Sequence, residues 1–154
     1  MIELEIDFSR RNIGVPMYIW DKNANKFEQI YALFDTGAHT SAIDTSLLLN
    51  LGYDLDDAPK SYIATATSSR ETAYRIRMDK IMLDDMPLES VLFNTFEFPP
   101  ISRSVIIGMN IIRHFEVGMN FKSKIITMRE NYLDENDDYY DYDTFGDWRA
   151  DHTY

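Results

Sequence analysis

The chain has 154 residues, a net charge of −11 and no cysteine. This length suits one domain with a sizeable core, and a hydrophobic content of 45% is ordinary for a soluble globular protein. The absence of cysteine excludes disulfides, cysteine-ligated zinc and thiol catalysis. The negative charge argues against a nucleic-acid partner, because phosphate contacts need Lys and Arg.

The sequence also gives no reason to expect a membrane partner, since no apolar run approaches the length that spans a bilayer. Apolar and charged residues alternate at the N-terminus, from Ile2 to Phe8. Such alternation is typical of a strand and not of a signal peptide. We therefore expect a cytoplasmic location.

The predicted elements are mainly short strands. In chain order, we expect strands over residues 2–8, 14–20, 27–34 and 40–43, a short helix over 46–50, a long hairpin over 59–83, strands over 86–95 and 105–108, a short helix over 109–115, and a last strand over 124–128. The sequence has no internal repeat. Many short strands with one or two short helices favour a closed all-β architecture.

One segment combines an apolar strand with a chemically useful turn: Tyr31-Ala32-Leu33-Phe34-Asp35-Thr36-Gly37-Ala38. The strand delivers one carboxylate to a fixed point, and Gly37 lets the backbone turn tightly and approach a partner closely. Ala38 leaves room for a substrate main chain. The Asp-Thr-Gly triplet occurs once in the chain. It resembles the active-site turn of the retropepsin-like, or retroviral-type, aspartic proteases.

Two further segments resemble that family in the right order. Thr40-Ser41-Ala42-Ile43 and a short helix follow the turn, and Val105-Ile106-Ile107-Gly108 comes much later. In the family, an apolar strand ending in Gly passes behind the catalytic turn, which assigns this place to Ile107 and Gly108. The intervening hairpin would be the flap over the substrate, and its tip would include Ala66, Thr67, Ser68 and Ser69. The resemblance covers about residues 13–128 and implies an all-β, retropepsin-like acid protease barrel.

The resemblance also implies a mechanism. Aspartic proteolysis needs two carboxylates that share a proton, so a chain with one such turn must take the second from another copy. We therefore expect a homodimer in which Asp35 of each chain is catalytic and the substrate is a peptide or protein. The Thr36 hydroxyl would reach across the two-fold axis, and the Gly37 carbonyl would bind substrate main chain. No cofactor or metal is expected.

The sequence departs from the retroviral pattern in two places. In those enzymes an acidic residue follows the Ala of the turn and pairs with an Arg after the second Gly, whereas here the two positions hold His39 and Met109. Viral flap tips are rich in glycine, whereas this chain has no glycine between Gly52 and Gly108. Substrate preference therefore does not transfer from the viral enzymes.

Other readings of the sequence remain open. The same fold could serve as a catalytically silent, dimerising peptide-binding module, because fold alone does not guarantee activity. An adaptor that grips a basic partner with its acidic end is a third possibility. Asp44-Thr45-Ser46 imitates the catalytic triplet but leads into a helix, which favours an N-cap over a second catalytic Asp. The three histidines, His39, His114 and His152, lack metal-ligand spacing.

The sequence divides into a domain over residues 1–129 and an acidic, aromatic-rich tail over residues 130–154. The tail holds nine acidic residues and one Arg, a net charge of −8, which leaves −3 for the domain. Such charge is typical of disordered segments. Seven aromatic residues in the tail favour docking on the domain or on a partner. Both interpretations remain open.

Overall fold

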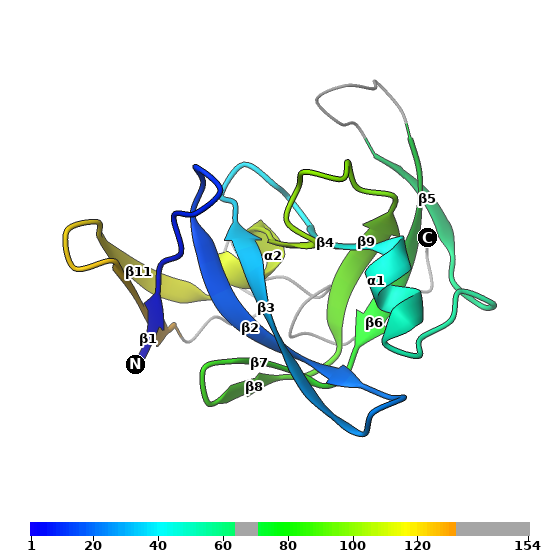
Figure 1. The fold of residues 1–154 in the computed structure, drawn as a ribbon, viewed down its shortest axis with the longest axis horizontal. Coiled ribbons are helices and arrows are strands. Elements are labelled where there is room, and N and C mark those ends of the chain that lie inside the picture. The colour runs from blue at the N-terminus through cyan, green and yellow to red at the C-terminus, as the bar shows by residue number, and fades with distance from the viewer. Residues whose placement is uncertain (64–70, 132–154) are drawn as a thin grey trace.

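The computed structural model of the chain describes residues 1–63 and 71–131. The strands in this part are β1 Ile2–Glu5, β2 Gly14–Asp21, β3 Lys26–Phe34, β4 Ser41–Asp44, β5 Lys60–Ile63, β6 Glu71–Met78, β7 Ile81–Leu83, β8 Met86–Leu88, β9 Val91–Phe96, β10 Val105–Ile107, β11 Phe115–Asn120 and β12 Ile125–Glu130 (Figure 1). The helices are α1 (Thr45–Asn50) and α2 (Met109–Ile112). The prediction of an all-β fold with one or two short helices is confirmed. The predicted flap tip, at Ala66, Thr67, Ser68 and Ser69, and the tail beyond residue 131 lie outside the described residues.

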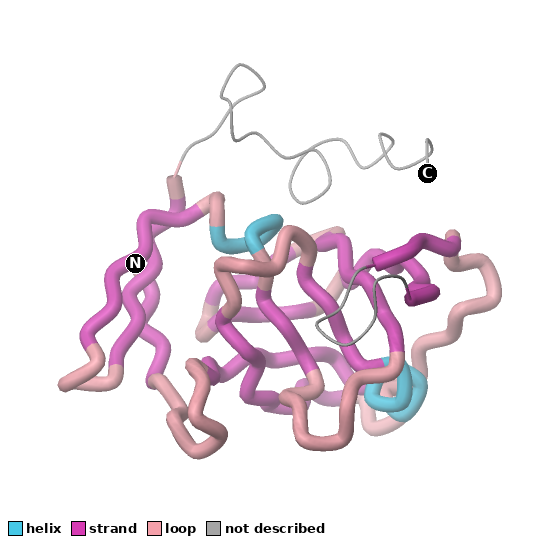
Figure 2. The backbone as a smooth tube through the Cα atoms, turned by 90° about the horizontal axis from the view of Figure 1, so that it is seen from above, coloured by secondary structure: helices cyan, strands magenta, loops and turns pink. Residues whose placement is uncertain are grey.

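The strands form two sheets. The larger sheet has the order β5-β6-β9-β4-β10-β3-β2-β7-β8, and the smaller has the order β1-β12-β11. In Figure 2 the smaller sheet, beside the N-terminus, stands at one side of the larger one. Residues of both sheets belong to one apolar core, which includes Leu4 and Ile126 of the small sheet and Val15 and Phe93 of the large sheet. Burial of each such side chain contributes about 1.5–3 kcal/mol to stability.

The β2–β3 hairpin carries the chain to the predicted catalytic turn. The two strands pair without interruption from Gly14 opposite Leu33 to Asp21 opposite Lys26. The carboxylate of Asp21 accepts hydrogen bonds from the backbone of its own turn, at Asn23 (2.8 Å) and Ala24 (3.0 Å). The alternation of β2 places Val15, Met17 and Ile19 in the core, which fixes the register of the hairpin.

The strand order brings distant parts of the chain together behind this turn. β10 lies between β3 and β4, parallel to β3 and antiparallel to β4. β4 in turn pairs in parallel with β9. The loop from β3 to β4, which contains Asp35, therefore lies beside the end of β10 and the start of α2.

Helix α1 begins and ends as its sequence suggests. Asp44 is the N-cap, and its Oδ2 accepts from the backbone N–H of Leu47 at 3.3 Å. The N-cap interpretation of Asp44 is therefore confirmed. Gly52 follows the helix with a φ of +89°, a conformation that glycine adopts without strain. The helix buries Leu48 against the core.

Arg103 fills a gap where β2 begins. Its guanidinium is nearly fully buried and packs where a side chain on Gly14 would lie, because a Cβ there would be 2.3 Å from Cζ of Arg103. It pairs with the Asp7 carboxylate at 3.1 Å and donates to Asn12 Oδ1 at 2.6 Å. The pKa of Asp7 is lowered, chiefly by hydrogen bonds from the amide and hydroxyl of Ser9 and then by Arg103.

Three predicted elements are wrong in part. The hairpin predicted over residues 59–83 ends at Met78, and Ile81–Leu83 forms the separate strand β7, which pairs with β2 and β8. The strand predicted over residues 86–95 is two strands, interrupted at Ser90, whose φ is 54°. The helix predicted over residues 109–115 is one turn long, and the residues after it begin β11, which the pattern did not predict.

Candidate active site

Hydrogen bonds donated by the backbone N–H groups of the Asp35 turn hold it in place. The N–H of Asp35 donates to the carbonyl of Ile107 at 3.0 Å, which anchors the turn to β10. The N–H of Gly37 donates to Asp35 Oδ1 at 2.8 Å, and the N–H of Ala38 donates to the Asp35 carbonyl at 3.3 Å. A Cβ on Gly37 would lie 3.1 Å from Asp35 Oδ1, so the glycine gives the carboxylate room. Asp35 is half-buried, whereas Thr36 and Gly37 are exposed.

A buried polar pair supports the turn from behind. Asn110 Oδ1 accepts from the backbone N–H of Ser41 at 2.8 Å and from the Ser41 hydroxyl at 2.7 Å. The Ser41 oxygen accepts from the N–H of Gly108 at 2.9 Å, and Asn110 Nδ2 donates to the Leu92 carbonyl at 2.9 Å. Both side chains are almost completely buried. The pair therefore joins β4, β9 and α2 through hydrogen bonds that are buried away from water.

Gly108 lets α2 approach the turn closely. A Cβ at this position would lie 2.8 Å from the Thr40 backbone carbon and 2.9 Å from the Ala38 oxygen. These neighbours are backbone atoms and cannot move aside as a side chain could. The close approach allows the N–H of Met109 to donate to the Ala38 carbonyl at 2.7 Å. The N–H of Asn110 likewise donates to the His39 carbonyl at 3.1 Å.

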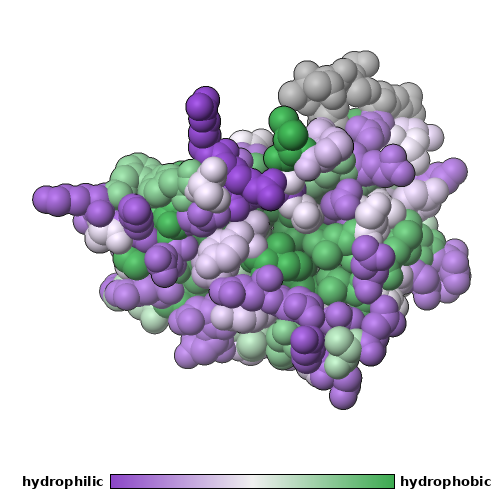
Figure 3. All heavy atoms as spheres, viewed as in Figure 1, coloured by the Kyte–Doolittle hydropathy of each residue, from purple (hydrophilic) through white to green (hydrophobic). Residues whose placement is uncertain are grey.

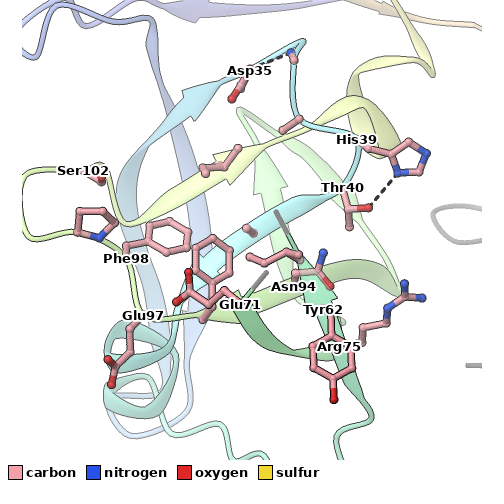
Figure 4. Close-up of a pocket in the computed structure, with 17 residues that line it drawn as sticks. Asp35, His39, Thr40, Tyr62, Glu71, Arg75, Asn94, Glu97, Phe98 and Ser102 are labelled. Atoms are coloured by element: carbon pink, nitrogen blue, oxygen red, sulfur yellow. Dashed lines mark hydrogen bonds between the residues drawn. The ribbon is translucent and has the colours of Figure 1, made fainter. Parts of the chain in front are cut away.

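A cleft of about 1060 Å³ opens beside the turn. Residues of the turn, of β4, β5, β6, β9 and β10, and of the loop after β9 line it: Asp35, Gly37, Ala38, His39, Thr40, Ala42, Tyr62, Ile63, Glu71, Arg75, Asn94, Phe96, Glu97, Phe98, Pro99, Ser102 and Ile106. Figure 4 shows Asp35 at one end of this cleft and Glu97 at the other. This separation gives no support to a carboxylate pair formed by these two residues of one chain.

The cleft contains a peptide-sized space, a carboxylate at one end and mixed polar and apolar walls. The family model described as "gag-polyprotein putative aspartyl protease" matches residues 23–114, which is more than half of the chain. The chain belongs to this family.

Solved structures show the same fold. A retropepsin-like aspartic protease from Rickettsia conorii is 15% identical, with a TM-score of 0.57 over 82% of this chain and 88% of that one. The retroviral protease-like domain of Ddi1 from Leishmania major is 20% identical, with a TM-score of 0.53 over 80% of this chain and 95% of that one. A search of curated proteins finds no match. The chain thus has the retropepsin-like fold that its Asp35 turn implied.

The predicted site residues of this retropepsin-like chain fall into three groups. Asp35, Gly37 and Ala38 line the cleft, and Thr36 is exposed beside them. Ile107 and Gly108 are buried next to the turn, and the Ile107 carbonyl accepts from the Asp35 N–H. The four flap candidates cannot be compared, because they lie outside the described residues. The roles predicted for all of these residues stay predictions.

The two positions that depart from the viral pattern take part in another arrangement. His39 Nδ1 lies 3.2 Å from the Thr40 hydroxyl, and Met109 contributes its backbone N–H to the turn. In this chain, backbone donors at the start of α2 connect the helix to the turn.

Ser41 and Asn110 were missed by the sequence analysis. A signal was available for Asn110, which stands between apolar residues, but not for Ser41, which follows His39 and Thr40. Polar residues in apolar segments are buried, and buried polar groups need partners. The sequence gave no indication that the two would be partners of each other across 69 positions.

The described residues were also compared with what a metal site and a membrane-spanning helix require. Among residues 1–63 and 71–131, no three His, Asp or Glu side chains gather closely enough to bind a metal ion. Within the same residues, no helix has both the length and the apolarity needed to cross a membrane.

Proposed function

We propose that the chain is an aspartic endopeptidase that hydrolyses peptide bonds through an Asp dyad assembled across a homodimer. The observation that carries this proposal is the Asp35 carboxylate, which the Gly37 N–H orients at one end of a large cleft. Membership of an aspartyl protease family supports a hydrolase.

The chemistry of the dyad follows from its charge. Two ionised carboxylates held a few ångströms apart repel each other strongly, so one of them keeps a proton. The ionised Asp35 removes a proton from a bound water, which attacks the peptide carbonyl carbon. The protonated Asp35 of the other copy donates to the carbonyl oxygen and stabilises the tetrahedral intermediate. The C–N bond then breaks as the first Asp35 gives the proton taken from water to the leaving amine, and the second Asp35 regains its proton from the intermediate's hydroxyl.

The second copy follows from the count of catalytic turns. The sequence contains one Asp-Thr-Gly triplet, and in the described structure Thr36 and Gly37 are exposed. A two-fold axis beside these residues would bring two identical carboxylates together. The Thr36 hydroxyl is then available to bond the opposite turn.

The decisive experiment compares wild type with Asp35→Asn on a peptide library, across acidic to neutral pH. Asn is nearly isosteric and keeps an oxygen for the Gly37 N–H, but it cannot exchange a proton. We expect cleavage to fall by about 10³-fold or more, with unchanged circular dichroism and sedimentation. Full activity in this variant would rule out the aspartic mechanism.

Assembly is tested separately by sedimentation of wild type and Thr36→Val. We expect a wild-type dimer at micromolar concentration and a weaker dimer for Thr36→Val. The Thr36 hydroxyl is exposed in the single chain but would be buried in the dimer, where its loss leaves its partners unpaired at about 1–3 kcal/mol. A strictly monomeric wild type would contradict the dyad. A dimer that binds peptides but cleaves none would be the silent peptide-binding module.

A further inference from the structure

The part of the cleft away from Asp35 combines aromatic rings with a carboxylate. Phe96 and Phe98 both line the cleft, and their ring centroids lie 4.6 Å apart. Glu71, the first residue of β6, lines the cleft as well. It pairs with Ile63 of β5, so these two side chains share a face of the sheet. Figure 4 shows Glu71 on the same side of the cleft as Phe98.

Hydrogen-bonded backbone holds these side chains in place. The N–H of Phe98 donates to Asp44 Oδ1 at 2.9 Å, which fixes the loop after β9 to the start of α1. β5 and β6 pair in register as far as Ile63 opposite Glu71. The aromatic wall and the carboxylate are therefore presented from two supported segments that meet at one cleft.

The Glu71 carboxylate lacks a partner in the described structure. Within residues 1–63 and 71–131 it makes no hydrogen bond and no ion pair, and it is half-buried. Charges beside apolar side chains also occur on the open surface (Figure 3), so the position inside the cleft is what distinguishes Glu71. The local dielectric constant is lower there than in water, which strengthens attraction to an opposite charge.

On the basis of the proposed function, we propose that Ile63, Glu71, Phe96 and Phe98, the Glu71 subsite, form a substrate subsite selective for a basic side chain. The methylene stem of Lys or Arg packs on the apolar side chains while the charged head reaches the carboxylate. Arg suits the subsite best, because its planar guanidinium binds a carboxylate through two hydrogen bonds and stacks on aromatic rings. A Glu at the same position would be repelled by Glu71.

The other charges of the cleft favour the same choice. Among the described residues that line it, Asp35, Glu71 and Glu97 are acidic and Arg75 is a permanent cation, so three minus one leaves a net charge of −2. Glu97 lies on the Phe98 side of the cleft, whereas Arg75 lies on the other side (Figure 4). Arg75 is also four residues from Glu71, about 13 Å along β6. The Arg75 charge is therefore too distant to neutralise Glu71.

The strand order indicates where along the substrate the basic residue binds. Four steps from strand to strand separate β3, which ends just before Asp35, from β6, which begins at Glu71. At about 4.8 Å a step the path is about 19 Å along the sheet, which about six residues of an extended peptide span. The proposed two-fold axis supplies a second Glu71 subsite on the other side of the cleaved bond. We therefore expect one basic position on each side, up to about six residues from the bond.

The experiment uses positional peptide libraries in which Arg, Lys, Gln or Glu is fixed at each position in turn. On each side of the cleaved bond we expect one position at which wild type cleaves the Arg series about 10-fold faster in kcat/KM than the Gln series. The Lys series should lie between these two, and the Glu series should be slowest. Glu71→Gln should remove the difference, and Glu71→Lys should reverse it in favour of Glu. Glu89→Gln is the matched control, since it makes the same charge change at an exposed residue that does not line the cleft.

A binding assay separates failure of this inference from failure of the proposed function. The same libraries are bound to immobilised Asp35→Asn protein, with and without Glu71→Gln, and the retained peptides are identified by mass spectrometry. If wild type cleaves nothing and Asp35→Asn still retains the Arg series through Glu71, the subsite stands and catalysis does not. Absence of a basic preference in both assays, or a preference unchanged by Glu71→Gln in a folded protein, overturns the inference.

Discussion

The two ends of the cleft are built in different ways. At the Asp35 end, backbone hydrogen bonds and the buried Ser41–Asn110 pair hold the turn, and close contacts around Gly108 leave no free space. At the Arg75 end, the wall consists of partly exposed side chains on paired strands. A substitution at the first end changes the position of the backbone, whereas a substitution at the second changes only the surface that a ligand meets.

Under the proposed function, this difference separates the two tasks that an endopeptidase has to perform. Catalysis requires a carboxylate in one place, and a densely bonded backbone provides it. Selectivity requires surfaces that can vary between relatives without loss of the fold, and side chains on a paired strand provide those. Three predictions test whether the separation holds, and a fourth concerns a residue outside both ends.

The largest effect is expected for Asn110→Ala. The substitution leaves two donors of Ser41 and the carbonyl of Leu92 without partners, at about 1–3 kcal/mol each, so we expect a loss of about 4 kcal/mol in the free energy of unfolding. Asn94→Ala, at the far wall, should lose less than about 1 kcal/mol, because its side chain accepts one long hydrogen bond from Ser61. Urea denaturation of both variants measures the contrast. Equal losses of unfolding free energy in Asn110→Ala and Asn94→Ala would contradict the expected contrast.

Gly108→Ala should have the next largest effect. The added methyl group meets backbone atoms of Thr40 and Ala38, so we expect a loss of about 3 kcal/mol in the free energy of unfolding and reduced cleavage by the folded fraction. The control is Gly118→Ala on β11, where the new methyl group meets only the Thr127 hydroxyl, a side chain that can rotate away. Its stability should stay within about 1 kcal/mol of wild type. If Gly118→Ala loses as much unfolding free energy as Gly108→Ala, contact with backbone atoms does not explain the effect at Gly108.

Asp44→Ala should have a moderate effect on helix α1 and on the cleft-lining loop after β9, between the two ends. Asp44 caps α1 through Leu47, and its other oxygen accepts from the N–H of Phe98 at 2.9 Å, which fixes the cleft-lining loop after β9. We expect a loss of about 1 kcal/mol and a raised KM with little change in kcat. Asp44→Asn keeps an acceptor and should preserve most of both values. Thermal unfolding and steady-state kinetics measure the two effects, and an altered kcat with an unchanged KM would contradict this assignment.

The smallest effect concerns pH and lies outside both ends. The pKa of Asp7 is lowered from its usual 3.8, so its ionised form favours the folded state. The stabilisation is present above pH 3.8 and is lost as the pH falls through the lowered pKa. In Asp7→Asn we expect lower stability at neutral pH and a weaker dependence of stability on pH below about 4. An unchanged acid limb in denaturation curves from pH 2 to 7 would show that Asp7 does not contribute.

Prediction from the sequence was most accurate for elements in which the apolar pattern, the turn residues and the helix caps all favour the same structure. The β2–β3 hairpin has alternating apolar residues and a polar turn, and α1 has an N-cap and a closing glycine. The Asp35 turn was predicted because three turn-forming residues end an apolar strand. In each case the pattern and the tertiary environment favour the same structure.

The missed elements depend on long-range pairing. β11 contains Gly118 and buries only Phe115 fully, so its strand character comes from pairing with β12 and not from its own pattern. β7 was assigned to the preceding hairpin, although it pairs with β2, more than sixty residues earlier. The Ser41–Asn110 pair was missed for the same reason, because it joins residues that are far apart in the sequence. The candidate site was therefore predictable in its catalytic turn and not in the bonds that support the turn.

The support of the turn also has a consequence for synthesis of the chain. The groups that hold the Asp35 turn from behind, at Ile107, Gly108 and Asn110, emerge from the ribosome about seventy residues after Asp35. Pairing across such a separation is slow to form. A nascent chain therefore carries the Asp35 carboxylate without the frame that orients it while these residues are added. If the chain is a protease, it stays harmless to its neighbours until the domain is nearly complete.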